Sequence, residues 1–233
     1  MEALPTLALI IPAHRVEGGW LEQIQQDLNE FKALVGASVS IEACLVLDGV
    51  SAEEVQHCKD QLQKDWSVFS LSENLGKGAS LRHGFKLMRA SYYMFTDNDF
   101  PYTAESMRDM LKQLMESGGV VFGRRTSGYR ARLPFKRRLL SDGLRLFNRY
   151  ILRLRHPDTQ CGLKAFDEQG KDLALSTSSS GFAFDLELAL LCRNSKLSWT
   201  AIDIDERKGL RFSEMPVSLL RREWKAVRKF LFR

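Results

Sequence analysis

The sequence predicts an α/β protein with a mostly parallel central sheet and helices on both faces. Short apolar runs alternate along the chain with segments in which apolar residues recur every three or four positions, and this is the order strand, helix, strand of a parallel sheet. The 233 residues are 44% hydrophobic and 27% charged, a balance typical of a globular domain with a substantial core.

The first half of the chain alternates regularly between the two patterns. Apolar runs of strand length occupy residues 6–12, 39–47, 66–71, 92–96 and 119–122. Segments with helical spacing follow them at residues 20–35, from residue 51, at residues 79–88 and from residue 103. Parallel strands joined by helices in this order form one sheet covered on both sides, so we expect a single domain over residues 1–215.

Local signals set where these elements begin and end. Asp48-Gly49 is a turn signal that closes the second strand. Ser51 caps the helix that follows, and Glu54 three residues later completes a capping box. Thr103 caps the helix after the fourth strand.

The pattern changes after residue 123. Residues 124–138 form a predicted loop rich in arginine, and a helix follows whose apolar face holds Leu140, Leu144, Phe147, Ile151 and Leu154. We expect a strand at residues 161–166, a helix at residues 182–192 and a last strand at residues 198–204.

Residues 216–233 predict a basic amphipathic helix. Its apolar positions recur at three- and four-residue steps, and arginines and lysines occupy the other face. Such a helix either docks on its own domain or lies in a membrane interface, where its arginines meet anionic lipid. The aromatic residues that extend to the end of the chain favour the interface.

Charge is distributed unevenly along the chain. Residues 124–155 hold eleven Arg or Lys and one acid, and residues 207–233 hold nine bases and two acids. The rest of the chain carries 26 acids against 14 bases. Two basic segments on an acidic domain indicate an anionic partner, which is a nucleic acid, a phosphorylated substrate or a membrane surface.

Several features bear on compartment. No apolar run approaches the roughly 18 residues of a membrane-spanning helix, and the N-terminal run lacks a basic region before it and ends in Pro12. The four cysteines are far apart with no CxxC pair, which favours reduced thiols in a cytoplasmic protein. The four histidines lack metal-ligand spacing.

The fourth predicted strand ends in Asp97-Asn98-Asp99, and Pro101 prevents its continuation. Carboxylates at the C-terminal end of a strand lie where open α/β sheets bind ligands. A divalent cation with a diphosphate would satisfy them. A turn of Asp and Asn that only ends the strand is the alternative.

Six motifs carry a family resemblance, namely IIPAH, LDG, NLGKGASLRHG, TDNDFPY, GRR and DTQCGLKAF. In this order and at these intervals they resemble the family 2 glycosyltransferases of the GT-A fold, and most of all the dolichyl- or polyprenyl-phosphate mannose synthases. The resemblance extends from Leu7 to about Ser213. It implies a GT-A fold and a nucleotide-sugar donor held by Mg²⁺ or Mn²⁺.

The resemblance also implies a donor and metal site. In it, Asp97 and Asp99 form the DxD motif that holds the metal and the donor, and Asp99 is catalytic. The implied donor-binding residues are Pro12, Glu17, Asp48, Lys77, Asp97 and Asn98. Other roles remain open for three of these: Glu17 as an exposed loop acid, Lys77 in a loop that only turns the chain, and Asn98 as a support of the turn.

The arginine-rich segment corresponds to the family's acceptor loop. The implied ligands of an acceptor phosphate are Arg125, Arg137, Ser141, Arg207, Arg211 and Ser213, with Arg125 and Arg137 also counted as catalytic. Arginine suits this task because its planar fork forms paired hydrogen bonds with phosphate. A solvated basic surface is the alternative.

These residues predict an inverting transfer of a hexose from GDP-mannose or a UDP-sugar to a polyprenyl or dolichyl phosphate at the cytoplasmic face of a membrane. A phosphate acceptor is already ionised and needs no base, only alignment and charge neutralisation. A saccharide or protein hydroxyl acceptor would instead need a carboxylate base, for which Asp185 and Glu187 are the candidates; otherwise we expect Glu187 to support the site. A binding protein for nucleic acid or membranes would leave the DxD motif unexplained.

Overall fold

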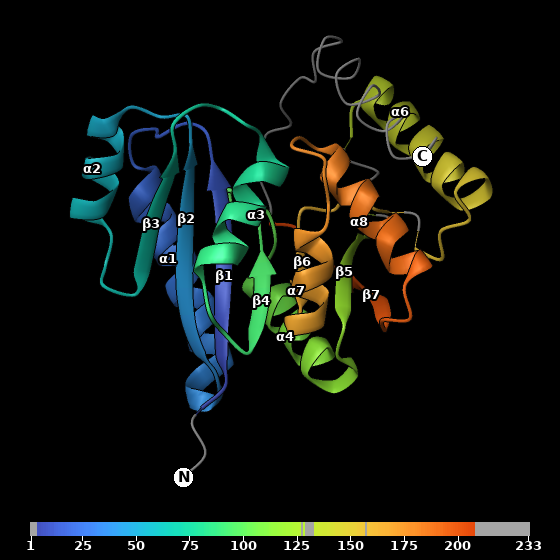
Figure 1. The fold of residues 1–233 in the computed structure, drawn as a ribbon, viewed down its shortest axis with the longest axis horizontal. Coiled ribbons are helices and arrows are strands. Elements are labelled where there is room, and N and C mark those ends of the chain that lie inside the picture. The colour runs from blue at the N-terminus through green and yellow to red at the C-terminus, as the bar shows by residue number, and fades with distance from the viewer. Residues whose placement is uncertain (1–3, 127, 129–132, 157, 208–233) are drawn as a thin grey trace.

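The computed structural model describes residues 4–126, 128, 133–156 and 158–207. These residues form one seven-stranded sheet with helices on both faces (Figure 1). The strands are β1 Thr6–Ala13, β2 Ser40–Asp48, β3 Trp66–Leu71, β4 Tyr92–Phe95, β5 Val120–Arg125, β6 Lys164–Phe166 and β7 Trp199–Ile204. The helices are α1 Trp20–Val35, α2 Ala52–Gln61, α3 Lys77–Leu87, α4 Ala104–Ser117, α6 Phe135–Leu146, α7 Glu168–Leu175 and α8 Ala183–Asn194, with a 3₁₀ turn η1 Gly36–Ser38 and a π turn η2 Phe147–Ile151.

The strand order is β3-β2-β1-β4-β6-β5-β7. Strand β6 pairs antiparallel with β4 and β5, and the other pairs are parallel. This confirms the predicted, mostly parallel sheet. Because β6 runs in the opposite direction, the loop that leads into it lies at the edge where β4 and β5 end.

Two apolar layers cover the sheet. Along β1, Leu9 packs with α1 and α4 on one face, and its neighbour Ile10 packs with α3 and α8 on the other. Figure 1 shows α3 and α7 in front of the sheet and α1 and α4 behind it. Strands that are apolar on both faces are expected in a parallel sheet between two helical layers.

Three parts of the second half depart from the sequence prediction. Helix α7 was not predicted, and the strand expected at residues 161–166 begins only at Lys164. The prediction of a single apolar helix face over residues 140–154 is wrong. Leu140 and Ile151 are exposed while Leu154 is buried, and the π turn η2 interrupts the regular helical spacing after α6.

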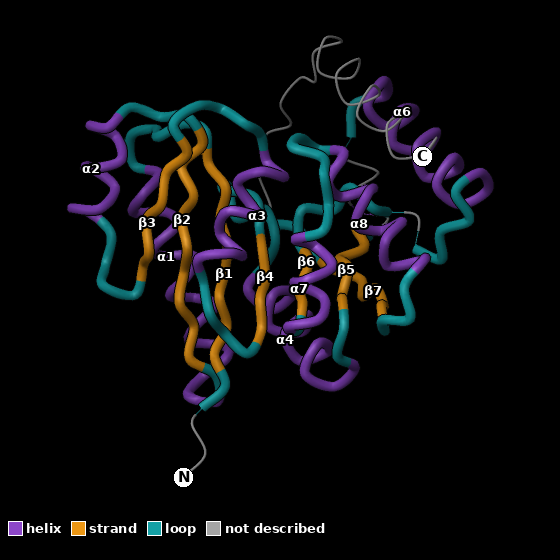
Figure 2. The backbone as a smooth tube through the Cα atoms, in the orientation of Figure 1, coloured by secondary structure: helices purple, strands orange, loops and turns teal. Residues whose placement is uncertain are grey.

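Helix α6 lies at the periphery of the molecule, beyond α8 rather than over the strands (Figure 2). Among the described helices, none combines the length and apolar character needed to cross a bilayer. The predicted amphipathic helix at residues 216–233 lies outside the described residues. All four cysteines are free and buried.

Candidate active site

The turn at residues 97–102 follows β4 at the edge where the parallel strands end. Phe100 adopts a left-handed φ of 42° with its side chain fully buried. Trp20 on α1 donates its indole N–H to the Asn98 carbonyl oxygen at 2.8 Å. A left-handed non-glycine residue costs about 1–3 kcal/mol and persists where its surroundings hold it. The buried ring and the Trp20 contact provide that support, and the two carboxylates of the turn are held at the rim.

The loop at residues 158–163 packs directly against the first of these carboxylates. A Cβ added at Gly162 would lie 1.8 Å from Asp97 Oδ2, so any larger residue there would displace this carboxylate. The Gly162 amide donates to the Tyr102 hydroxyl at 2.7 Å, and Tyr102 is itself buried at the end of the turn. The loop before β6 and the turn after β4 are therefore one packed unit.

Lys77, at the first position of α3, lies between two carboxylates. Its Nζ is 2.8 Å from Asp97 Oδ1 and 3.6 Å from Asp185 Oδ2. Burial lowers the pKa of Lys77, but the charges of Asp185 and Asp97 outweigh burial, and the net pKa is raised. Lys77 therefore stays protonated and carries a positive charge beside the DxD turn.

Asp99 lies on the rim of the same turn. Withdrawal of its carboxylate from water raises the pKa of Asp99, and the nearby charge of Asp97 raises it further. Two carboxylates that repel one another favour a cation between them. No cluster of three or more potential metal ligands occurs within the described residues. Asp97 and Asp99 offer carboxylate oxygens, the ligands that Mg²⁺ and Mn²⁺ prefer, and water and phosphate oxygens would complete the shell of such an ion.

Arg125, at the end of β5, and Arg145, on α6, share the carboxylate of Asp158. Arg125 places Nη2 2.5 Å from Oδ1 and Nε 3.1 Å from Oδ2, and Arg145 places Nη2 2.8 Å from Oδ2. Burial raises the pKa of Asp158, but the two guanidinium groups outweigh it and the net pKa is lowered. Since Asp158 and Gly162 belong to one short loop, this loop joins the arginine pair to the Asp97 carboxylate.

The model of the family Glycosyl transferase family 2 matches residues 9–169. This range holds the DxD turn, Lys77 and the loop at residues 158–163. The chain belongs to glycosyl transferase family 2. The assignment to this family (GT2) that was made from the motifs is confirmed.

The curated relatives of this GT2 chain include two dolichyl-phosphate beta-glucosyltransferases. The protein of Saccharomyces cerevisiae is 26% identical over 235 residues, which cover 91% of this chain and 66% of that protein. The protein of Drosophila melanogaster is 29% identical over 222 residues, which cover 84% and 68%. This chain therefore spans about two thirds of the length of the relatives it matches.

Solved structures show the same fold. Mannosyl-3-phosphoglycerate synthase from Rubrobacter xylanophilus superimposes with a TM-score of 0.68 at 15% identity, over 98% of this chain and 74% of that one. Glucosyl-3-phosphoglycerate synthase from Mycobacterium tuberculosis, solved with Mn²⁺, UDP and phosphoglyceric acid, gives a TM-score of 0.59 at 15% identity, over 96% and 76%. The predicted GT-A fold is confirmed.

The predicted donor residues of this GT2 domain take different positions. Asp48 is buried, and its carboxylate accepts the backbone N–H groups of Leu75 and Gly76, both at 2.8 Å. It therefore holds the loop before α3, and its predicted role in donor binding stays a prediction. Pro12 lies near the end of β1 at the same sheet edge. Glu17 is exposed in the loop that precedes α1.

Glu187, on α8, holds the backbone of a neighbouring loop. Its carboxylate accepts the backbone N–H groups of Ser178 and Ser179 at 2.9 and 2.8 Å. The loop that it fixes packs on the Gly-Lys-Gly segment, where a Cβ at Gly78 would lie 2.4 Å from the Ser179 carbonyl oxygen. Asp185, two residues earlier, points instead to Lys77.

The Arg207 side chain turns toward α1. Its guanidinium pairs with Asp27 and Glu30 on α1. Its backbone amide nevertheless donates to the Pro101 carbonyl oxygen at 2.9 Å. The chain after β7 thus passes beside the DxD turn, while the Arg207 side chain ties it to α1.

The predicted acceptor residues Arg211 and Ser213 lie outside the described residues, as does the side chain of Arg137. Ser141 is half-buried on α6, four residues before Arg145, and shares its helical face.

Sequence reasoning missed Arg145, Gly162 and the buried Lys164. A lysine inside a predicted buried strand was the available signal for Lys164, because buried lysines are rare unless they are paired.

Proposed function

We propose that this protein transfers glucose from UDP-glucose to a polyprenyl phosphate such as dolichyl phosphate, with Mg²⁺ or Mn²⁺. The observation that carries the proposal is the loop at residues 158–163. It joins a pair of arginines, suited to an acceptor phosphate, to the carboxylate that would hold the cation and donor. Asp97 lies just after β4 and Arg125 is the last residue of β5, and these two strands are separated only by β6. Their backbones are therefore about 10 Å apart.

Each end of this arrangement has a chemical task. Asp97 and Asp99 would hold the cation, which acts as a Lewis acid on the departing diphosphate. Lys77 adds a positive charge beside the same carboxylate. Asp158 holds the guanidinium groups of Arg125 and Arg145 together, and two guanidinium groups side by side suit an acceptor phosphate. The phosphate oxygen is already ionised and needs no base, so alignment and charge neutralisation suffice.

The relatives support the choice of sugar and acceptor. The curated relatives named above are dolichyl-phosphate beta-glucosyltransferases. A structural neighbour was solved with Mn²⁺ and UDP-glucose. We therefore place glucose and UDP ahead of mannose and GDP, and an inverting reaction remains our expectation.

The test is a transfer assay with the full chain, labelled UDP-glucose or GDP-mannose, Mn²⁺ and a polyprenyl phosphate in detergent. We expect label from UDP-glucose in the organic phase, none from GDP-mannose, and none when a chelator removes the cation. The unphosphorylated polyprenol is the matched control acceptor. Label that stays water-soluble with a saccharide, protein or 3-phosphoglycerate acceptor, and never enters the lipid, would reject the proposal.

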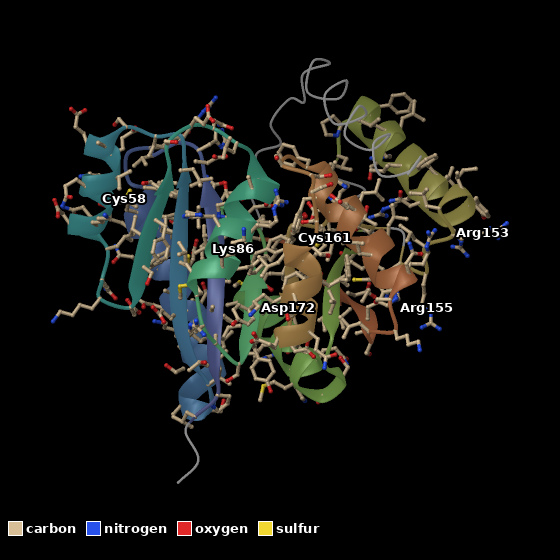
Figure 3. All side chains as sticks on the ribbon, in the orientation of Figure 1. Cys58, Lys86, Arg153, Arg155, Cys161 and Asp172 are labelled. Carbon is tan, nitrogen blue, oxygen red and sulfur yellow. The ribbon has the colours of Figure 1, made fainter. Side chains whose placement is uncertain are left out.

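We further propose that α6 and η2 contact the membrane that supplies the lipid, on its cytoplasmic face. Six large apolar side chains of this segment are at least 47% exposed: Phe135, Leu139, Leu140, Leu146, Tyr150 and Ile151. Arg153 and Arg155 project from the outer edge of the molecule just beyond it (Figure 3). Apolar side chains interleaved with arginines suit an anionic bilayer surface.

Flotation with anionic and neutral vesicles tests the membrane contact. The double variant Leu139→Ser and Ile151→Ser is expected to bind anionic vesicles about tenfold more weakly. Its control replaces Leu34 and Met115, exposed apolar residues on α1 and α4, and keeps vesicle binding. Equal binding by all three proteins would place the contact elsewhere, with the segment at residues 216–233 as the next candidate.

A further inference from the structure

Four charges of alternating sign run from the core to the rim of the site. Lys164 Nζ is 2.5 Å from Asp185 Oδ1, Asp185 Oδ2 is 3.6 Å from Lys77 Nζ, and Lys77 Nζ is 2.8 Å from Asp97 Oδ1. They come from β6, α8, α3 and the turn after β4, so only the tertiary fold places them in a row.

The inner pair is fixed. Lys164 is fully buried, and its ammonium donates to the carbonyl oxygens of Thr159 and Cys161, at 3.1 and 2.7 Å, as well as to Asp185. An ammonium has three donors, and all three are used. The Asp185 side chain is 2% exposed. Its second oxygen, Oδ2, faces Lys77.

The outer pair has more freedom. The Lys77 side chain is 10% exposed and that of Asp97 is 37% exposed. Lysine carries its charge on a flexible four-carbon stem. A small rotation about this stem exchanges the nearer carboxylate, because both oxygens already lie within 4 Å of the same ammonium. Lys77 thus has two possible partners, one at the rim and one in the interior.

We propose that Lys77 is a built-in counter-ion of Asp97 that competes with the divalent cation, and that Asp185 receives Lys77 when the cation binds. Asp185 is then a positioning residue, and Lys164 holds it in place. This inference rests on the cation site of the proposed function. It concerns how that site is regulated.

The arrangement has a consequence for the order of binding. Without a donor, Lys77 weakens the hold of Asp97 on a bare cation, since two cations share one carboxylate. A bound diphosphate offers Lys77 a second anion and also offers oxygens to the cation. Cation and nucleotide then strengthen one another's binding, and the site retains its cation chiefly when the donor is present.

The experiment is a Mn²⁺ titration of the full chain, followed by the electron paramagnetic resonance signal of free Mn²⁺, with and without UDP. We expect Lys77→Met to bind Mn²⁺ about tenfold more tightly than the wild type in the absence of UDP. The gain in Mn²⁺ affinity that UDP causes should be smaller in this variant than in the wild type. Lys77→Arg keeps the charge and is expected to bind as weakly as the wild type.

Asp185→Asn is expected to weaken Mn²⁺ binding several-fold, because Lys77 then remains on Asp97. In the double variant with Lys77→Met this weakening should disappear. A purely structural role for Asp185 would lower thermal stability and leave the Mn²⁺ dissociation constant unchanged. If Asp185→Asn fails to fold, the Lys77 variants decide the question alone.

The matched control is Lys171→Met. Lys171 also pairs with an acid, Glu168, and lies 4.9 Å from the ring centroid of Tyr93, but it belongs to α7. It should leave Mn²⁺ binding unchanged. If Lys77→Met binds Mn²⁺ as weakly as the wild type or more weakly, the counter-ion role of Lys77 is wrong, while the proposed function still stands. Failure of the wild type to bind Mn²⁺, with or without UDP, overturns the proposed cation site as well.

Discussion

The two halves of the site are built in different ways. On the carboxylate side, Asp97 and Asp99 directly follow β4, and the end of that strand sets their place. On the arginine side, Asp158 holds Arg125 and Arg145, which are 33 and 13 residues away in the sequence. One side depends on the local path of the backbone and the other on ion pairs between distant segments.

This difference predicts different vulnerabilities. The carboxylate side should be sensitive to any atom that displaces the turn, and insensitive to changes that leave the backbone in place. The arginine side should depend on pH, because a buried carboxylate with a lowered pKa holds it together. The following experiments separate the two, from the largest expected effect to the smallest.

Asp99→Ala should reduce transfer from the nucleotide sugar by at least about a thousandfold, because the cation loses a ligand and charge on the leaving diphosphate is no longer stabilised. Asp99 lies on the rim of the turn, where the residue is exposed and its carboxylate is only partly withdrawn from water, so the melting temperature should change little. The rate is measured with Mn²⁺ and after chelation. The control is Asp109→Ala, a surface acid on α4 that pairs with Arg108. Full, chelator-resistant activity of Asp99→Ala would remove the DxD turn from the mechanism.

Gly162→Ala should reduce transfer by about a hundredfold, because an added Cβ displaces the Asp97 carboxylate and misplaces the donor. The matched control is Gly143→Ala on α6, where an added Cβ meets no atom within 4 Å. Gly143→Ala should keep activity and stabilise the helix by about 0.5–1 kcal/mol. Thermal unfolding and transfer rates of both variants provide the measurement. Equal activities would mean that the turn tolerates displacement.

Asp158→Asn should destabilise the fold by about 3 kcal/mol near neutral pH, because two guanidinium groups lose a buried counter-charge. The pKa of Asp158 is lowered in the folded state, so its contribution is present above the unfolded value of about 3.9. That contribution is lost as pH falls through the lowered pKa. The difference in unfolding free energy between wild type and variant should therefore shrink as the pH falls below about 3.9.

Urea denaturation at several pH values measures this difference. The control is Asp203→Asn, which breaks an exposed pair with Arg124 and should cost less than about 1 kcal/mol. A difference for Asp158→Asn that stays constant with pH would show that the carboxylate charge does not hold the arginines.

The sequence predicted most of the first half well. The strands at residues 6–12 and 66–71 and the capping box at Ser51 appear as expected. Such signals are local, because a buried strand must be apolar and a helix start must satisfy its own N–H groups. Prediction failed where the pattern is not local. The π turn η2 interrupted the helical spacing expected after α6, and α7 was not foreseen.

The sequence by itself determined the order of strands and helices in the first half, the carboxylates at the end of β4 and membership of a glycosyltransferase family. Only the tertiary structure decided the partners of the charged residues. It turned the Asp48 carboxylate to a backbone loop, Arg207 to α1, and Lys77 to a carboxylate on α8. The reason is physical: secondary structure follows from neighbours along the chain, whereas the partner of a charge depends on which distant segments the fold brings within a few ångströms of it.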